Sequence, residues 1–165
     1  MNSSQFNKIL VVKHGSLGDI AFSILAMASI KQFFSNATID LLTEEKYVNF
    51  LSNSNYFNSI FKDNRKGIID SLKVILKINQ NKYDLIIDLQ NSKRTNNYWS
   101  FLKFISEVKV NGSRSNCDIQ YVIPPQGTES PQQGLYNQLK LLGVNEIYQN
   151  VDWLSRDITA INEDK

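Results

Sequence analysis

The stretch that decides the fold is Ile9-Leu10-Val11-Val12-Lys13-His14-Gly15-Ser16-Leu17-Gly18-Asp19. Its run of aliphatic residues predicts a strand that is buried on both faces, because such a strand shows no alternation of apolar and polar positions. The strand leads into a polar loop, and a long apolar helix is predicted to follow at 20–34. α/β proteins place their ligands at such a junction, at the carboxyl end of a parallel strand.

The remaining sequence alternates apolar runs with helical patterns. Ser130 and Pro131 form a clear helix start, and Gly143 is a suitable stop for that helix. Strands that alternate with helices favour a mostly parallel sheet with helices on both faces. We therefore predict a single Rossmann-like α/β domain over 1–154, followed by a polar tail or the start of a linker at 155–165. Further strands are predicted at 37–42, 57–61, 83–89, 108–110 and 119–123, and further helices at 44–51, at 68–78 and up to about 105.

The composition excludes several kinds of site. Cys117 is the only cysteine, so the chain has no internal disulfide and no zinc site built from several thiolates. His14 is the only histidine, which excludes a histidine-rich metal site. The net charge is +2, and residues 62–103 carry nine Lys or Arg and four Asp or Glu. A nucleic-acid-binding face is usually more strongly basic, so we interpret these charges as a solvated surface and expect no nucleic-acid partner.

The sequence shows no membrane-spanning or secretory signal. No stretch approaches the roughly 18 apolar residues that cross a bilayer. Residues 1–7 lack the apolar core of a signal peptide. We therefore expect a cytoplasmic protein. Peripheral contact with the inner face of the cytoplasmic membrane stays open, because basic residues attract anionic lipids without insertion.

The loop that follows the first strand has two chemical interpretations. It lacks the Gly-Lys-Ser/Thr ending of a P-loop and does not follow the G-x-G-x-x-G pattern, and glycines are common at such turns for backbone reasons alone. Asp19 is either a carboxylate stabilised by the helix dipole or a general base that accepts a proton from an attacking hydroxyl. The free N–H groups of the helix start also suit a bound anion.

Two further strand ends carry polar side chains. Residues 88–95 supply a carboxylate, two amides, two hydroxyls and two cations, which would suit an anionic ligand rich in hydroxyl groups. Helix capping with a solvated lysine and arginine is the structural alternative. Residues 111–114 form another strand end with a cation. Tyr98, Trp99 and Phe101 are interpreted as packing aromatics.

Three segments in this order resemble the N-terminal half of the heptosyltransferases, glycosyltransferase family 9. They are the loop 13–19, the strand end 83–90 with Arg94-Thr95, and the turn 111–114. The late helix 132–142 and Asp152-Trp153-Leu154 fit as well, so the resemblance covers about 8–154. It implies a two-domain enzyme of the GT-B type. Such an enzyme transfers a heptose or related sugar from a nucleotide sugar such as ADP-heptose to the growing lipopolysaccharide core.

The resemblance also implies roles for particular residues. Asp19 matches the family's proposed base. Lys13, Gln90, Lys93 and Arg94 are expected to position an anionic sugar or a lipid-linked core oligosaccharide as acceptor, while no metal and no cofactor is implied. His14 receives no role and is expected to be a neutral loop histidine. The other expected substrate-binding residues are Gly15, Ser16, Gly18 and Arg114.

The chain departs from the family in having no second, donor-binding domain. We therefore expect it to be the acceptor-binding half of a glycosyltransferase that is inactive alone and whose other half could lie on another chain. Two other interpretations stay open. One is a non-catalytic α/β module that holds a nucleotide or small anion at the 15–19 turn, and the other is a stable domain without activity.

Overall fold

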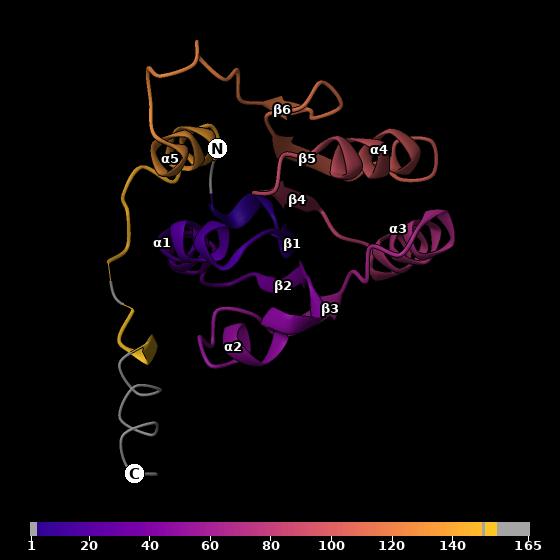
Figure 1. Ribbon diagram of the computed structural model, residues 1–165, viewed down its shortest axis with the longest axis horizontal. Helices are drawn as coiled ribbons and strands as arrows, with labels where there is room; N and C mark the ends of the chain where they lie inside the picture. Colours follow the sequence, from indigo (N-terminus) through magenta and orange to yellow (C-terminus); the bar gives the residue numbers. More distant parts are fainter. Residues whose placement is uncertain (1–2, 150, 155–165) are drawn as a thin grey trace.

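A computed structural model describes residues 3–149 and 151–154 of the chain. Figure 1 shows one sheet with helices on both of its faces. The strands are all parallel and lie in the order β3-β2-β1-β4-β5-β6. This is the strand order of the doubly wound Rossmann fold. The predicted fold class, a single Rossmann-like α/β domain, is confirmed.

The elements follow one another in strict strand–helix alternation as far as α4. The strands are β1 (Lys8–Val12), β2 (Thr38–Thr43), β3 (Ser59–Lys62), β4 (Leu85–Asp88), β5 (Lys109–Gly112) and β6 (Ile119–Gln120). The α-helices are α1 (Leu17–Phe33), α2 (Val48–Ser52), α3 (Ile68–Asn81), α4 (Lys93–Leu102) and α5 (Pro131–Lys140). Two single 3-10 turns, η1 (Ser3–Gln5) and η2 (Glu45–Tyr47), complete them.

Strand β1 divides the core into two clusters. Successive side chains of a strand point to opposite faces. Ile9 and Val11 therefore pack with α1 and α5, while Leu10 and Val12 pack with α3 and α4. Figure 1 shows these two helix pairs on opposite sides of the sheet. All four aliphatic side chains are fully buried, which explains why the strand shows no polar position.

Helix α1 begins three residues earlier than predicted, at Leu17 rather than Ile20. The reason is a capping box at its start. The Ser16 hydroxyl accepts from the Asp19 N–H at 3.3 Å, and the Asp19 carboxylate accepts from the Ser16 N–H at 2.7 Å. Helix α4 ends earlier than predicted, at Leu102 instead of 105, and only isolated turns follow it.

The carboxyl-terminal elements agree with the sequence in part. β6 is only two residues long, because β5 ends at Gly112 and offers no partner beyond Gln120. Gly143 adopts a positive φ of 93° just after α5, as expected of a helix stop. The prediction for 155–165 lies outside the described residues. No helix in the described part of the chain is both long and apolar enough to cross a membrane.

Of the aromatic residues interpreted as packing groups, two are confirmed. Tyr98 and Trp99 are buried in the cluster under α3 and α4. Phe101 is 45% exposed, so the packing interpretation is wrong for this residue. It lies about 160° around α4 from Trp99 but only about 60° from Tyr98, which places it at the edge of the buried face.

Candidate functional site

The predicted site residues meet at one edge of the sheet. β1 and β4 are neighbours and parallel, so the loop 13–19 and the loop 88–95 lie side by side at their carboxyl ends. The His14 N–H donates to Gln90 Oε1 at 3.0 Å, and Lys13 Nζ donates to the Leu89 carbonyl at 3.3 Å. From the end of β5, Arg114 Nε donates to the Asn91 carbonyl at 2.5 Å. All three strand ends therefore contribute to one surface.

Asp19 lies exposed in the first turn of α1. Its Oδ2 accepts hydrogen bonds from the Ser16 N–H at 2.7 Å and from the Ser16 hydroxyl at 2.8 Å. These two bonds, helped by the nearby Lys13 ammonium, hold the pKa of Asp19 below its usual value. Both bonds fall on Oδ2, and among the described residues no hydrogen bond is found on Oδ1. Asp19 is therefore ionised at neutral pH and accessible.

Gly15 fixes the path of the chain into this turn. Its φ is +116°, and a Cβ there would lie 2.6 Å from Asp19 Oδ2. The Gly15 N–H donates to Glu44 Oε1 at 3.0 Å, and the Tyr47 hydroxyl donates to the Gly15 carbonyl at 3.0 Å. Gly18 has an ordinary backbone conformation, and the nearest atom to a Cβ there would be Ser16 Oγ at 3.7 Å. Its missing side chain leaves the surface beside Asp19 open.

A buried polar cluster beside this turn was missed by the sequence analysis. Asp63 follows β3 directly, is buried, and accepts from the Tyr98 hydroxyl at 2.8 Å. His14 Nε2 lies 3.5 Å from one Asp63 oxygen, and the Arg94 guanidinium lies 3.5 Å from the other. Glu44, which follows β2, pairs with Arg65 at 2.8 Å. The sequence signal that could have identified both acids was their position shortly after a predicted strand.

His14 is neutral, as predicted, but it does not lie in an open loop. Burial lowers its pKa to about 4, against the opposing effect of the adjacent Asp63 carboxylate. Lys13 is also buried, and desolvation lowers the pKa of its ammonium group. The residues before and after Gly15 thus differ in burial. Lys13 and His14 point inward and support the surface, whereas Ser16 and Asp19 are exposed on it.

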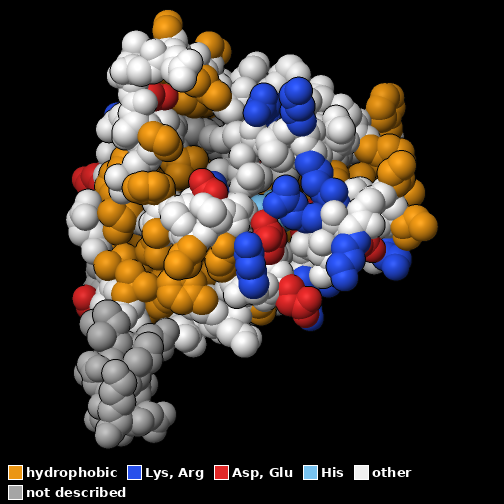
Figure 2. Space-filling view, viewed as in Figure 1, with side chains coloured by type: hydrophobic (Ala, Val, Ile, Leu, Met, Phe, Trp, Pro, Cys, Tyr) orange, Lys and Arg blue, Asp and Glu red, His pale blue; other side chains and the backbone are white. Residues whose placement is uncertain are grey.

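Charged side chains surround a hollow next to this cluster. Its volume is about 500 Å³. Figure 2 shows the histidine at the centre of a group of basic and acidic side chains. Of the predicted cations, Arg94 lines this hollow, and Lys93 is exposed at the start of α4. The other lining residues are Glu44, Glu45, Lys46, Asp63, Asn64, Arg65 and Lys66.

Asp88 holds the loop 88–95 in place through hydrogen bonds from its backbone. Its fully buried carboxylate accepts from the N–H groups of Gln90 and Asn91 at 3.0 and 2.9 Å and from the Trp99 indole at 2.7 Å. Burial nevertheless raises the pKa of Asp88. Ser92 caps α4 by accepting from the Thr95 N–H at 3.1 Å. The capping interpretation is therefore confirmed for this serine, while Arg94 points to the charged hollow.

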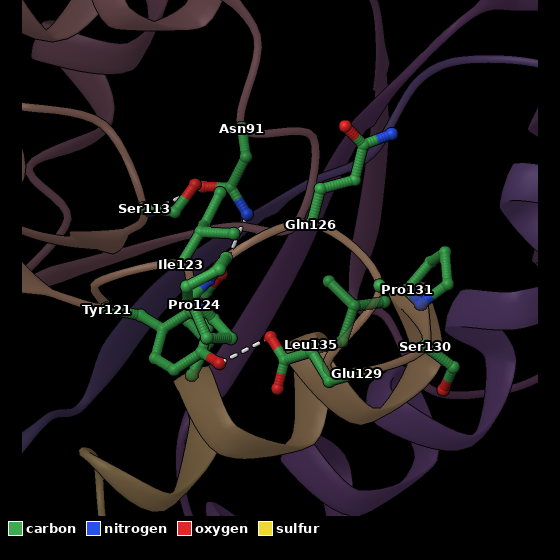
Figure 3. Close-up of a pocket in the computed structure, with 14 residues that line it drawn as sticks. Asn91, Ser113, Tyr121, Ile123, Pro124, Gln126, Glu129, Ser130, Pro131 and Leu135 are labelled. Atoms are coloured by element: carbon green, nitrogen blue, oxygen red, sulfur yellow. Dashed lines mark hydrogen bonds between the residues drawn. The ribbon is translucent and has the colours of Figure 1, made fainter.

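A second, mostly uncharged pocket lies on the other side of the same loop. Figure 3 shows Asn91 and Ser113 facing the segment that joins β6 to α5. Its volume is about 280 Å³, with a wall of Ile123, prolines and Leu135. The Tyr121 hydroxyl donates to Glu129 Oε1 at 2.5 Å across it. The carboxyl edge of the sheet thus carries a charged hollow and a neutral pocket separated by residues 90–94.

Comparison with known proteins gives one relative and several structures of similar fold. No protein-family profile matches the chain. A lipopolysaccharide heptosyltransferase 1 from Campylobacter coli is 32% identical over 87 residues, which are 50% of this chain and 25% of that protein. The chain therefore matches only about a quarter of the length of this relative.

The similar structures are glycosyltransferases of about twice the length. A family 9 glycosyltransferase from Veillonella parvula superposes with a TM-score of 0.72 at 18% identity, over 94% of this chain and 48% of the other. The E. coli heptosyltransferase WaaC, solved with ADP-2-deoxy-2-fluoro heptose, gives 0.62 at 14% identity over 88% and 51%. The E. coli ADP-heptose heptosyltransferase II gives 0.61 at 16% over 87% and 44%. In sequence and in fold, the chain is similar to part of a heptosyltransferase-like glycosyltransferase of family 9.

Proposed function

We propose that this chain is the acceptor-binding half of a glycosyltransferase that moves a heptose-like sugar from a nucleotide-sugar donor, such as ADP-heptose, to a lipopolysaccharide-core-type acceptor. A second domain or a second chain supplies the donor site. The similarity to a heptosyltransferase supports the class of reaction. The observation that carries the proposal is the ionised, exposed Asp19 at the carboxyl edge, in the loop after β1, the strand that neighbours β4. This reaction belongs to the cytoplasm, at the inner face of the membrane.

The proposed role of Asp19 is that of the general base. An acceptor hydroxyl oxygen attacks the anomeric carbon of the donor sugar, and the bond from that carbon to the nucleotide diphosphate breaks. The hydroxyl proton passes to Asp19. Because hydrogen bonds from Ser16 lower the pKa of this carboxyl, it is a weak base, and it takes the proton only as the new bond makes the hydroxyl acidic. The step requires neither a metal nor a cofactor.

The cations of the second loop are assigned to an anionic acceptor. Arg94 lines the charged hollow: its buried Nη2 lies 3.5 Å from Asp63 Oδ1, while 26% of the side chain that carries the guanidinium group is exposed. A phosphate or carboxylate on the acceptor would give this group a charge-assisted partner. The amide oxygen of Gln90 is held by the His14 N–H, which leaves the Gln90 NH2 group to donate to acceptor hydroxyls. Lys93 adds an exposed positive charge at the rim.

The anion-binding alternative at the 15–19 turn is less well supported. The N–H groups of Gly15 and Ser16 already donate to carboxylates, and that of Asp19 donates to a hydroxyl. A nucleotide phosphate would compete with these partners for the three N–H groups and would approach two negative charges, Glu44 and Asp19. Such a site favours proton transfer over anion binding.

The substitution Asp19→Asn tests the catalytic role. An asparagine retains an oxygen that can accept from the Ser16 N–H, so helix α1 still begins at the same residue. In the complete enzyme that contains this chain, we expect kcat to fall by about 10²–10⁴ with little change in acceptor affinity. Asp70→Asn is the matched control, because Asp70 also lies in the first turn of a helix but does not line the charged hollow. A kcat that stays within about threefold of the wild-type value would remove Asp19 as the base.

Calorimetry on this chain alone separates the two binding modes. A phosphorylated core oligosaccharide is expected to bind, and Arg94→Gln is expected to weaken it by about tenfold through loss of the charged contact. The nucleotide sugar is expected to give no measurable heat, because its site belongs to the other half. Tight binding of the nucleotide sugar, with none of the oligosaccharide, would contradict the acceptor assignment.

A further inference from the structure

Helix α3 carries an apolar surface that the fold does not use. Its buried side chains, Val74, Ile75 and Ile78, pack on the sheet. A second set of large apolar side chains on the same helix is exposed to solvent. At about 100° per residue, this second set falls within one arc about 100° wide that adjoins the buried face. It consists of Ile68, Ile69, Leu72 and Leu76, which are 79%, 71%, 40% and 53% exposed and are called the α3 stripe.

Basic residues border the α3 stripe. Lys73 and Lys77 follow it around the helix, and Lys66 precedes the first turn. Residues 62–82 contain six Lys or Arg and two Asp, and one of these acids, Asp63, is buried in the polar cluster and adds no negative charge to the surface. Figure 2 shows hydrophobic side chains with Lys and Arg beside them on the flank where Figure 1 places α3 and α4. The exposed Phe101 and Phe104 near the end of α4 add apolar surface to this helix pair.

We propose that the α3 stripe docks on an anionic phospholipid surface. A helix with exposed aliphatic side chains and flanking lysines is the type that lies in the plane of a membrane interface, with its apolar residues among the headgroups and acyl chains. Lysines beside such a helix are attracted to anionic lipids. Interfaces between proteins are depleted in lysine, so the lysine border favours lipid over a second copy of the chain.

The position of α3 relative to the candidate site fits this surface. The helix begins at the carboxyl edge of the sheet, directly after Arg65 and Lys66, which line the charged hollow. The two most exposed residues of the stripe, Ile68 and Ile69, form its first turn. Arg94 NH1 donates to the Arg65 carbonyl at 3.5 Å, which ties this end of the helix to the second loop. A membrane against the stripe would lie beside the opening of the hollow. The inference does not rest on the proposed reaction.

Vesicle co-sedimentation of the 165-residue chain tests the proposal without any activity measurement. The chain is expected to bind vesicles of phosphatidylglycerol and phosphatidylethanolamine at low ionic strength. Binding to pure phosphatidylcholine vesicles is expected to be at least about tenfold weaker. Salt at about 0.5 M is expected to weaken binding to the anionic vesicles, because screening shortens the reach of the lysines.

Matched variants show whether vesicle binding depends on the α3 stripe or on exposed apolar residues in general. Leu72→Gln and Leu141→Gln change leucines that are 40% and 41% exposed, the second lying at the end of α5 on the opposite face of the sheet. We expect about fivefold weaker binding for the first and a change within about twofold for the second. Lys73→Gln combined with Lys77→Gln is expected to weaken binding by about tenfold, and Lys140→Gln on α5 to leave it unchanged. The substitutions other than Lys77→Gln are not expected to alter the melting temperature, whereas Lys77→Gln should lower it slightly, because the Lys77 ammonium lies 4.1 Å from the centre of the Phe61 ring.

Three outcomes would overturn the proposal. The first is a failure of the wild-type chain to bind either kind of vesicle. The second is equal weakening by the Leu72 and Leu141 substitutions. The third is a concentration-dependent dimer that Leu72→Gln dissociates, in the absence of vesicle binding, which would assign the stripe to contact between copies of this chain.

Discussion

At the residue scale, Gly15 couples the shape of the first loop to the position of Asp19. An alanine there would have to keep a φ of +116° while its Cβ meets Asp19 Oδ2 at 2.6 Å. Gly67 is a suitable control, since its φ is +103° and nothing lies within 4 Å of a Cβ there. We expect Gly67→Ala to lower the free energy of unfolding by about 1–3 kcal/mol through backbone strain alone. Gly15→Ala should lose about 1 kcal/mol more.

Urea unfolding of both variants measures this difference, and turnover by the complete enzyme gives a second readout. Only Gly15→Ala should reduce kcat, because only this alanine displaces the Asp19 carboxylate. Equal stability losses in the two variants, with equal kcat, would show that the close approach of Gly15 and Asp19 is not important.

His14 makes the stability of the fold depend on pH. A histidine in the unfolded chain has a pKa of about 6.5, and burial lowers that of folded His14 to about 4. Between these values the unfolded chain binds a proton that the folded chain does not bind. The free energy of unfolding should therefore fall as the pH drops from about 7 to about 5, by about 1–2 kcal/mol.

His14 is the only histidine, and the buried Asp88, whose pKa is raised, acts with the opposite sign because its folded form binds a proton more readily than the unfolded chain does. The variant His14→Gln should show a nearly flat stability between these pH values, whatever its absolute stability. Urea denaturation curves at both pH values check the slope. A slope equal to that of the wild-type chain would assign the effect to another group.

At the element scale, Gln138 anchors α5 to the strand ends that carry the site. Its buried amide NH2 donates to the Asp88 carbonyl at 3.2 Å and to Asn111 Oδ1 at 3.0 Å. Its amide oxygen accepts from Asn91 Nδ2 at 2.7 Å. Gln138→Leu would leave these three groups, two of them buried and one partly buried, without this partner, so we expect the free energy of unfolding to fall by about 2–4 kcal/mol.

Gln133→Leu is the control on the same helix, because the side chain of Gln133 is exposed. It is expected to change stability by less than about 0.5 kcal/mol. Chemical denaturation of both variants measures the contrast. A Gln138→Leu variant as stable as the control would mean that apolar packing fully replaces the hydrogen bonds.

The elements show what local sequence can predict and where it stops. Ser130 before Pro131 was identified as a helix start, and the Gln133 N–H donates to its hydroxyl at 3.1 Å. Ser16 is likewise the N-cap of α1, but Gly18, two residues later, made the first turn of this helix look like part of a loop in the sequence. A glycine weakens a helical pattern, and only the reciprocal bonds with Asp19 show that the helix has begun.

The sequence analysis missed the acidic residues of the site for a different physical reason. Asp63 and Glu44 act at the site because β2 lies beside β1 and β3 lies beside β2, a neighbourhood set by strand order rather than by local pattern. The sequence predicted strands that end at 42 and 61, two residues before these acids, but not that the acids would lie beside His14. Tyr98 was identified as a packing aromatic, which it is, yet its hydroxyl also donates to Asp63 across 35 residues. Such contacts become predictable only once the order of the strands is known.

At the scale of the whole molecule, two large hollows lie at opposite edges of the sheet. The charged hollow at the carboxyl edge, lined by Arg65 and Arg94, has a volume of about 500 Å³. Another, of about 800 Å³, lies at the amino edge beside Asn7, Asp84 and the segment that follows α4. Size alone would favour the amino edge. Parallel α/β sheets bind ligands outside the carboxyl ends of their strands, where helix starts and strand ends meet, so the smaller hollow is the better candidate.

Hydrogen–deuterium exchange distinguishes the two edges in one experiment. With a phosphorylated core oligosaccharide bound, amides in 13–19 and 89–95 should exchange more slowly, because the ligand covers loops in which many amides donate to side chains. Amides in 82–84 and 103–108, which line the amino-edge hollow, should exchange at the same rate with and without it. Arg94→Gln should reduce the slowing at the carboxyl edge in proportion to the lost affinity. Slower exchange at 103–108 alone would place the acceptor at the opposite end of the strands and, with it, remove the link between Asp19 and sugar transfer.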